Sequence, residues 1–142
     1  MPEIQIQTKT QFEIVDITDR VKQLVDESGV EKGVAVIFAP HTTAAIKLNH
    51  LEPLLLQDIM KMLYRLAPVD INYSHDFFEI RAQLRDDERS NGHAHVKSFL
   101  LGASEAVPIE GRQLVLGDRQ SIFFVELDGG RERRAFVQII GE

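Results

Sequence analysis

One apolar segment constrains the fold of this chain more than any other feature. Residues 34–39 are all apolar and include two valines and an isoleucine, which is typical of a strand buried on both faces. The segment 40–43, Pro-His-Thr-Thr, interrupts it, and residues 44–48 have the composition of a second strand. The sequence therefore predicts a central strand that breaks at His41, and loops at strand ends are where binding residues usually lie.

Hydrophobic periodicity predicts further elements on both sides of this strand. Helices are expected over residues 18–29, capped by Thr18 and closed by Gly29, over residues 53–66, and from Gly92 onward. The third helix is expected to bury Val96, Phe99, Leu100 and Ala103. Strands are expected where residues 4–14 alternate, and over residues 77–80, 113–116, 120–127 and 133–140.

Two connections stand out in this pattern. Asp128, Gly129 and Gly130 lie between the last two predicted strands and predict a tight hairpin. Residues 69–89 lack periodicity and are polar at their end, which indicates a long surface loop of the kind that is often functional. Together these elements predict a single compact α+β domain over residues 1–142, with a mixed or antiparallel sheet packed against about three helices.

Composition excludes several classes of function. The net charge of −6 argues against nucleic acid as a partner, because phosphate binding requires a concentrated basic face. The first residues lack the basic start and apolar run of a signal peptide, and no apolar stretch approaches the roughly 20 residues of a membrane helix. We therefore expect a cytoplasmic protein with no membrane partner. The absence of cysteine excludes a thiolate nucleophile and any zinc site built on sulfur.

Histidines are the remaining candidates for metal or acid–base chemistry. His41 follows the central strand, and it belongs either to a site or to an ordinary Pro-His-Thr turn. His93 and His95 are two residues apart, so on a helix their side chains point about 200° apart and cannot share an ion. Either the helix begins after His93, or only one of the two faces a site. A helix start with N–H groups free for an anion and one with a single half-buried histidine are both open alternatives.

Charged residues near the predicted hairpin form a second candidate group. Glu126 and Asp128 lie beside Arg131, and they either form a salt bridge or supply a general base and a phosphate clamp. Arg131, Arg133 and Arg134 can likewise hold a phosphate or line a solvated strand edge.

Several short motifs occur in succession along the chain. They are His41-Thr-Thr-Ala-Ala-Ile, Asn49, Asn91-Gly-His-Ala-His-Val-Lys, Leu100-Leu-Gly, Leu116-Gly, Gln120-Ser-Ile-Phe-Phe-Val-Glu126 and Asp128-Gly-Gly-Arg131. This succession strongly resembles the YjbQ-like family, small proteins linked to a secondary thiamine-phosphate synthase activity. The resemblance covers nearly the whole chain, from about Ile4 to Gly141.

The resemblance implies a compact α+β subunit that assembles as a homotrimer, with sites near the subunit interfaces. It also implies a metal-binding pocket in which His41, His75 and His95 are the three nitrogen ligands, an arrangement that leaves zinc one open position. The candidate catalytic residues are then His41, His95 and Glu126. The candidate ligand-binding residues are Thr42, Thr43, Asn49, Lys97, Gln120 and Arg131.

Three positions depart from the family pattern. His50 replaces a usual glutamate, which removes a site carboxylate or exchanges it for an imidazole. Arg119 replaces a tryptophan. Gly130 replaces a proline, which changes only the stiffness of the turn.

We therefore expect an enzyme that acts on a small phosphorylated molecule, with thiamine phosphate synthesis as the reaction that the family suggests. That reaction joins a pyrimidine pyrophosphate to a thiazole phosphate and expels pyrophosphate. Lys97, Arg131 and the N–H groups after Gly92 can neutralise the leaving group.

The expected cofactor is a divalent metal, zinc or magnesium. A histidine-rich pocket suits zinc, whereas magnesium requires carboxylates such as those of Glu126, Asp128 and Asp58. The alternatives to the synthase are a non-catalytic trimeric protein that binds a metal or ligand, and a metal-dependent hydrolase of a phosphate ester or amide.

Overall fold

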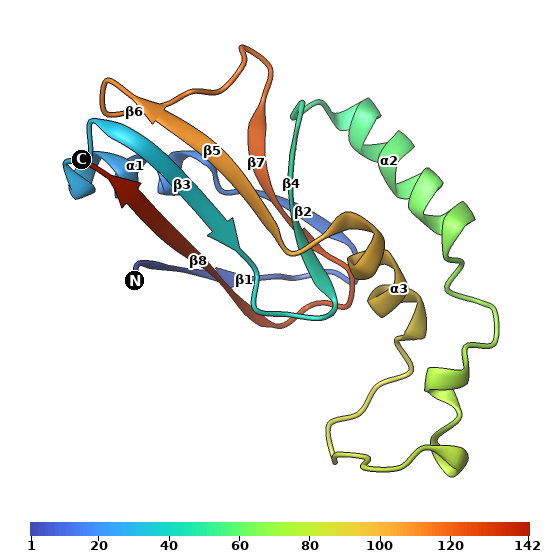
Figure 1. The fold of residues 1–142 in the computed structure, drawn as a ribbon. Coiled ribbons are helices and arrows are strands. Elements are labelled where there is room, and N and C mark those ends of the chain that lie inside the picture. The colour runs from blue at the N-terminus through green and yellow to red at the C-terminus, as the bar shows by residue number, and fades with distance from the viewer.

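The fold consists of two antiparallel sheets with helices at one edge and at one side (Figure 1). A computed structural model describes residues 1–142. The larger sheet has the order β1 (Glu3–Gln7), β8 (Glu132–Gly141), β3 (Lys32–Phe38), β5 (Ser104–Glu110) and β6 (Gln113–Leu114). The smaller sheet has the order β2 (Glu13–Asp16), β7 (Ser121–Glu126) and β4 (Ala44–Asn49). The three helices are α1 (Thr18–Ser28), α2 (Pro53–Leu66) and α3 (Gly92–Leu101). The predicted α+β class is confirmed.

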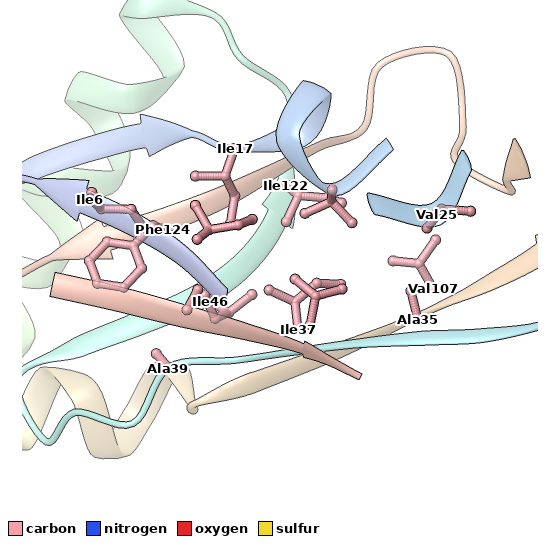
Figure 2. Packing of buried hydrophobic residues seen from close by; sticks show 14 of the residues in the cluster. Ile6, Ile17, Val25, Ala35, Ile37, Ala39, Ile46, Val107, Ile122 and Phe124 are labelled. Carbon is pink, nitrogen blue, oxygen red and sulfur yellow. The ribbon is translucent and has the colours of Figure 1, made fainter. Parts of the chain in front are cut away.

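The main core lies between the two sheets (Figure 2). Ile37 of β3 and Phe124 of β7 are fully buried there, and α1 adds Val21 and Val25. The predicted central position of β3 is confirmed, since β8 and β5 pair with its two edges. Its outer face is not covered, however, and Phe38 is 42% exposed.

The prediction for the third helix was wrong in orientation. Val96, Phe99 and Leu100 are exposed, Phe99 by 87%, and Ala103 follows the helix in a half-buried position. The opposite face is buried instead and carries Gly92, His93, Ala94, Lys97 and Ser98. Ala94 packs in a second apolar cluster with Leu63 of α2 and Phe123 of β7. The small residues of α3 thus allow close approach to the smaller sheet, which leaves the larger apolar side chains outward.

The predicted hairpin at Asp128–Gly130 was also wrong. β7 pairs with β2 and β4, whereas β8 pairs with β1 and β3, so the turn carries the chain from one sheet to the other. The β3–β4 and β1–β2 connections cross between the sheets at the same end, because Gln7 lies opposite Glu132 and Ala44 lies opposite Glu126. Three crossovers therefore meet at one end of the molecule.

Smaller differences concern element boundaries. Residues 77–80 are not a strand, and 3-10 turns occupy Ser74–Asp76 and Phe78–Ile80. Thr18 is the first helical residue rather than a cap, and its backbone nitrogen donates to Asp16 Oδ1 at 3.0 Å. β5 was not predicted, and the alternation of residues 4–14 belongs to two strands in different sheets. No helix has the length and apolar character needed to cross a membrane.

Candidate functional site

The candidate site is a pocket of about 590 Å³ beside the three crossovers. His41, Thr42 and Thr43 of the β3–β4 crossover form one wall, and the start of α3 with the loop before it forms another. Guanidinium groups outnumber carboxylates in its lining: Arg81, Arg85, Arg89, Arg131 and Arg133 face it, against Asp87 and Glu88. We call it the arginine pocket. It is a cationic pocket in a chain whose net charge is −6.

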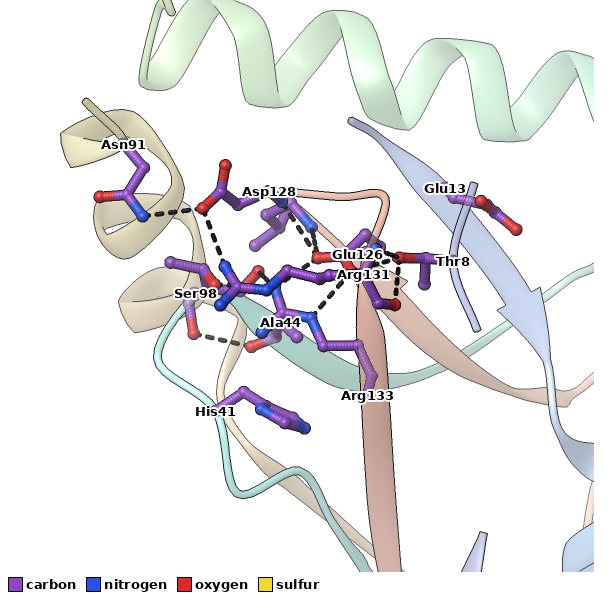
Figure 3. A network of polar contacts seen from close by, with 12 residues as sticks. Thr8, Glu13, His41, Ala44, Asn91, Ser98, Glu126, Asp128, Arg131 and Arg133 are labelled. Atoms are coloured by element: carbon purple, nitrogen blue, oxygen red, sulfur yellow. Dashed lines mark hydrogen bonds and ion pairs between the residues drawn. The ribbon is translucent and has the colours of Figure 1, made fainter. Parts of the chain in front are cut away.

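Glu126 and Arg133 form a buried ion pair behind this pocket (Figure 3). Arg133 Nε donates to Glu126 Oε1 at 2.8 Å and Nη2 to Oε2 at 2.5 Å. Thr8 Oγ1 and the backbone N–H groups of Leu127 and Asp128 also donate to the carboxylate. Burial alone would raise the pKa of Glu126, but the hydrogen bonds from Arg133 and Thr8 outweigh it and the pKa is lowered. Glu126 is fully buried and fully bonded, so its geometry suits joining the crossovers rather than general-base catalysis.

A glycine allows the crossovers to approach this closely. A Cβ atom on Gly129 would collide with the carbonyl oxygen of Thr10 in the β1–β2 crossover. The backbone N–H of Gly129 also donates to the Gln11 carbonyl at 3.1 Å. The Gly-Gly sequence, which predicted a hairpin, instead permits contact between two crossovers.

Asp128 is the centre of a second, half-open network (Figure 3). Its carboxylate lies 3.3 Å from Arg131 and 3.5 Å from Arg89, and Asn91 Nδ2 donates to it at 2.8 Å. Asn91 Oδ1 lies 3.0 Å from His75 Nε2. Because an amide oxygen only accepts, His75 Nε2 carries a proton and donates it in this contact.

His75 and His95 lie together in the arginine pocket. Their ring centroids are 4.6 Å apart, with His75 on the 3-10 turn and His95 on α3. The pKa of His95 is lowered because the ring is partly buried and because His75 is close to it. Of the two α3 histidines, His95 lines the pocket, whereas His93 is buried beside Phe12 and Lys97, so they point apart as helix geometry required.

His41 is held at the edge of the same pocket. Its Nε2 lies 3.1 Å from both the backbone nitrogen and the backbone oxygen of Arg134. The ring also packs edge-on against Phe124 at 6.1 Å. Burial and the charge of Arg133 lower the pKa of His41, so both His41 and His95 are neutral imidazoles at pH 7.

The residues do not fit a complete metal site. No three histidine or carboxylate side chains are grouped so that they could share an ion. His75 and His95 form a pair, but His41 Nε2 is engaged by the Arg134 backbone. The three carboxylates considered for magnesium do not converge either, since Glu126 and Asp128 bind arginines and Asp58 is exposed on α2.

Three expected ligand-binding residues lie outside the arginine pocket. Lys97 is 1% exposed, and its Nζ donates to the Ala67 carbonyl at 2.7 Å and lies 2.9 Å from His93 Nδ1. Asn49 and Gln120 are exposed at the far end of the β4–β7 pair, where Asn49 lies opposite Ser121. In this chain the residues expected to bind a ligand are therefore divided between the two ends of the smaller sheet.

Sequence reasoning missed most of the arginines in the pocket. Arg81, Arg85 and Arg89 lie in the loop between α2 and α3, which was interpreted only as a long polar surface loop. Their spacing of four residues was the available signal. Arg133 was considered only as part of a cluster, because the sequence gives no sign that it is buried opposite Glu126.

Comparisons with known proteins agree with the motifs. The family model described as UPF0047 protein YjbQ-like matches residues 2–142. A UPF0047 protein of Methanothermobacter thermautotrophicus is 37% identical over 140 residues, which cover 99% of this chain and 91% of the relative. The UPF0047 protein YugU of Bacillus subtilis is 34% identical over 139 residues, 97% of each chain.

Solved structures show the same fold. A YbjQ-like protein of unknown function from Sulfolobus solfataricus matches with a TM-score of 0.90 and 39% identity, over 99% of this chain and 96% of that chain. An uncharacterised YjbQ/UPF0047 protein from Clostridium acetobutylicum matches with a TM-score of 0.87 and 40% identity, over 99% and 100% of the two chains. The chain therefore belongs to the YjbQ-like (UPF0047) family.

Proposed function

We propose that the arginine pocket binds a small phosphorylated molecule, and that the protein is a transferase of the thiamine-phosphate synthase type. One observation carries the proposal: five guanidinium groups and three imidazoles face one pocket that only two carboxylates line. Guanidinium groups bind phosphate oxygens in bidentate geometry. Charge neutralisation at a departing pyrophosphate is the main requirement of that reaction.

The residues divide into two roles in this proposal. Arg85 has no ion-pair partner, and Arg131 shares Asp128 with Arg89, so these cations are available to the phosphate. His41 and His95 are neutral and exchange protons with the bound molecule near pH 7. The new C–N bond forms from the thiazole nitrogen as the C–O bond to pyrophosphate breaks, so pyrophosphate leaves with the bonding electrons.

We also propose that the chain acts as a homotrimer. The exposed side chains of Val96, Phe99 and Leu100 form an apolar stripe on α3, and Leu54 and Leu66 of α2 are also exposed. Contiguous apolar surface of this kind marks interaction sites in soluble proteins. Size-exclusion chromatography with light scattering tests this by measuring the mass of the assembly. The wild-type protein is expected to be a trimer and Phe99→Asp a monomer. A monomeric wild-type protein contradicts the proposal.

The binding step is tested by titration calorimetry with inorganic pyrophosphate at low salt. Arg85→Gln and Arg131→Gln are expected to weaken binding about five- to ten-fold each. Arg112→Gln is the matched control, because Arg112 is an exposed arginine between α1 and β6, away from the pocket. Equal affinities for all three variants contradict the proposed site.

The reaction is tested in a thiamine-requiring strain that lacks its dedicated synthase. Wild-type protein is expected to restore growth, and His41→Asn or His95→Asn to abolish it. Arg112→Gln, away from the pocket, is the control that retains rescue. Failure of soluble wild-type protein to rescue, or rescue by all variants, contradicts the synthase.

The second candidate function is a metal-binding role, which the His75–His95 pair favours. This pair supplies two nitrogen ligands, and a complete site requires a third. Elemental analysis of untagged protein incubated with zinc tests it. Zinc at one ion per chain, lost in His75→Ala and His95→Ala, supports this role, and a trace amount contradicts it.

A further inference from the structure

A second pocket lies directly against the arginine pocket, on the outer surface of β1 and β8. Its volume is about 450 Å³, and it shares His41 and Arg133 with the arginine pocket. Its other polar residues are Glu3, Gln5 and Gln7 of β1, and Glu132 and Arg134 near the start of β8. We call it the glutamine pocket.

Strand alternation explains why this surface is polar. Ile4 and Ile6 point into the core and are 4% exposed, so the odd-numbered residues of β1 point outward. The register places Gln5 opposite Arg134 and Gln7 opposite Glu132. One row of polar side chains from each strand therefore forms the floor of the pocket.

The uncompensated charge of this pocket is a carboxylate, because Arg133 pairs with Glu126 and Arg134 with Glu3. Glu132 forms no ion pair, and no protein group bonds to the side chain of Gln5. Gln7 uses its Nε2 to donate to the Thr8 carbonyl, which leaves its Oε1 free. The one cation on the outer face, Arg134, lies 4.0 Å from Glu3 and 5.0 Å from the Phe136 ring. Such a surface recognises N–H donors and disfavours anions.

His41 and Arg133 form the boundary between the two pockets. Arg133 uses Nε and Nη2 to bind Glu126 and Thr43, and no protein group accepts from its Nη1. No fully buried side-chain nitrogen or oxygen lacks a partner, so this Nη1 is not completely shielded from solvent, although the Arg133 side chain is only 3% exposed. His41 is fixed through Nε2, and its Nδ1 makes no bond within the chain. Figure 3 shows the His41 ring on the side of Arg133 away from Asp128.

We propose that the glutamine pocket binds a second ligand group, neutral or cationic and rich in amino or amidine N–H donors, while the arginine pocket holds phosphate groups. His41 then lies between the two groups. The inference rests on the proposed function, and it explains how groups of opposite electrostatic character meet at one imidazole.

The test uses benzamidine, whose amidinium carries N–H donors, and benzoate, which has a similar shape and the opposite charge. Both are titrated in the presence of saturating inorganic pyrophosphate, so that the arginine pocket is filled. Benzamidine is expected to bind at one site per chain and benzoate not to bind. Glu132→Gln is expected to weaken benzamidine about five-fold. Glu110→Gln, an exposed residue at the far end of the same sheet, is the control and leaves the affinity unchanged.

Two readouts separate this inference from the proposed function. The His41 ring proton signal, assigned by its loss in His41→Asn, is expected to shift with either probe alone. Pyrophosphate binding that survives without any benzamidine site overturns the second-ligand inference only, and so does equal weakening by Glu132→Gln and Glu110→Gln. Benzamidine binding without pyrophosphate binding overturns the proposed function and leaves the glutamine pocket as a ligand site.

Discussion

Two carboxylates of the same crossover, Glu126 and Asp128, bind arginines in opposite ways. Glu126 is fully buried, and one arginine satisfies it in bidentate geometry together with Thr8 and two backbone N–H groups. Asp128 lies at the pocket wall and is shared by Arg89 and Arg131 at 3.5 and 3.3 Å. In the first pair the two charges compensate each other, whereas the second group leaves positive charge uncompensated.

The two acids, only two residues apart, therefore suit different roles: Glu126 a structural one, and Asp128 the proposed binding of an anion. A buried, complete pair holds the crossovers together, because losing one partner leaves an unpaired charge away from water. A half-open pair with excess cation suits an anion that arrives from solution. The same Glu-x-Asp pattern therefore combines a structural anchor with the proposed binding element, whereas the sequence alone presents two equivalent acids.

The largest expected effect comes from breaking the buried pair. Glu126→Gln keeps the side-chain shape but leaves Arg133 unpaired, and the free energy of unfolding is expected to fall by about 3–5 kcal/mol. Urea unfolding at pH 7 measures it, with the exposed Glu31→Gln as control.

A double replacement sharpens the same prediction. Glu126→Leu combined with Arg133→Leu removes both charges, and is expected to cost less than Glu126→Gln alone. Losses below about 1 kcal/mol for Glu126→Gln would contradict the assignment of Glu126 as an anchor.

Asp128 is expected to behave in the opposite way. Asp128→Asn removes the carboxylate that competes for Arg89 and Arg131, so pyrophosphate affinity is expected to rise about three- to ten-fold. Stability is expected to fall by no more than about 1.5 kcal/mol, because the amide can still bond to Asn91. Calorimetry and urea unfolding of the same samples measure both, and Asp118→Asn in an exposed turn is the control. Weaker pyrophosphate binding by Asp128→Asn would show that Asp128 organises the arginines rather than competing for them.

Local sequence patterns predicted where the strands lie better than they predicted which strands pair with each other. The composition of β3 identified a central strand, and Pro53 identified the start of α2. The Asp-Gly-Gly turn suggested a hairpin because turn chemistry is local. Which sheet receives β8 depends instead on contacts with β1 and β3, far away in the sequence. The apolar stripe of α3 was likewise assigned to the core, because a single chain gives no sign that its apolar face is left outside.

The candidate site was predictable to a similar degree. His41, Thr42, Thr43, His75, His95 and Arg131 all line the arginine pocket, as the motifs suggested. Lys97 was misplaced because its side of α3 faces α2 rather than the loop. The loop arginines were missed, since an irregular polar segment gives no register from which to derive their direction.

The pH dependence of anion binding is a smaller effect. It involves two histidines, His41 near Glu126 and His95 near Asp128. Because the pKa values of His41 and His95 are lowered in the free protein, both imidazoles are neutral at pH 7, and a bound anion favours their protonation. Sulfate keeps a constant charge over this range, and its affinity is expected to rise a few-fold from pH 8 to pH 6. Free histidines with lowered pKa values oppose folding below about pH 6.5, so sulfate is expected to stabilise the protein most at the acidic end. Calorimetry over this pH range measures the affinity, and a slope unchanged in His95→Asn would exclude His95 as a contributor.

The final prediction concerns a buried cation that has no carboxylate partner. Burial lowers the pKa of Lys97 to about 8, below its ordinary value of 10.5 in the unfolded chain. Between these two values the unfolded chain holds more protons than the folded one, so Lys97 causes stability to rise with pH across that window. The gain is expected to be of the order of 2 kcal/mol between pH 8 and pH 10. It is measured as the difference between wild type and Lys97→Met, which lacks the titrating group. Parallel stability curves for the two proteins would mean that Ala67 and His93 compensate the Lys97 charge as fully as Glu126 compensates that of Arg133.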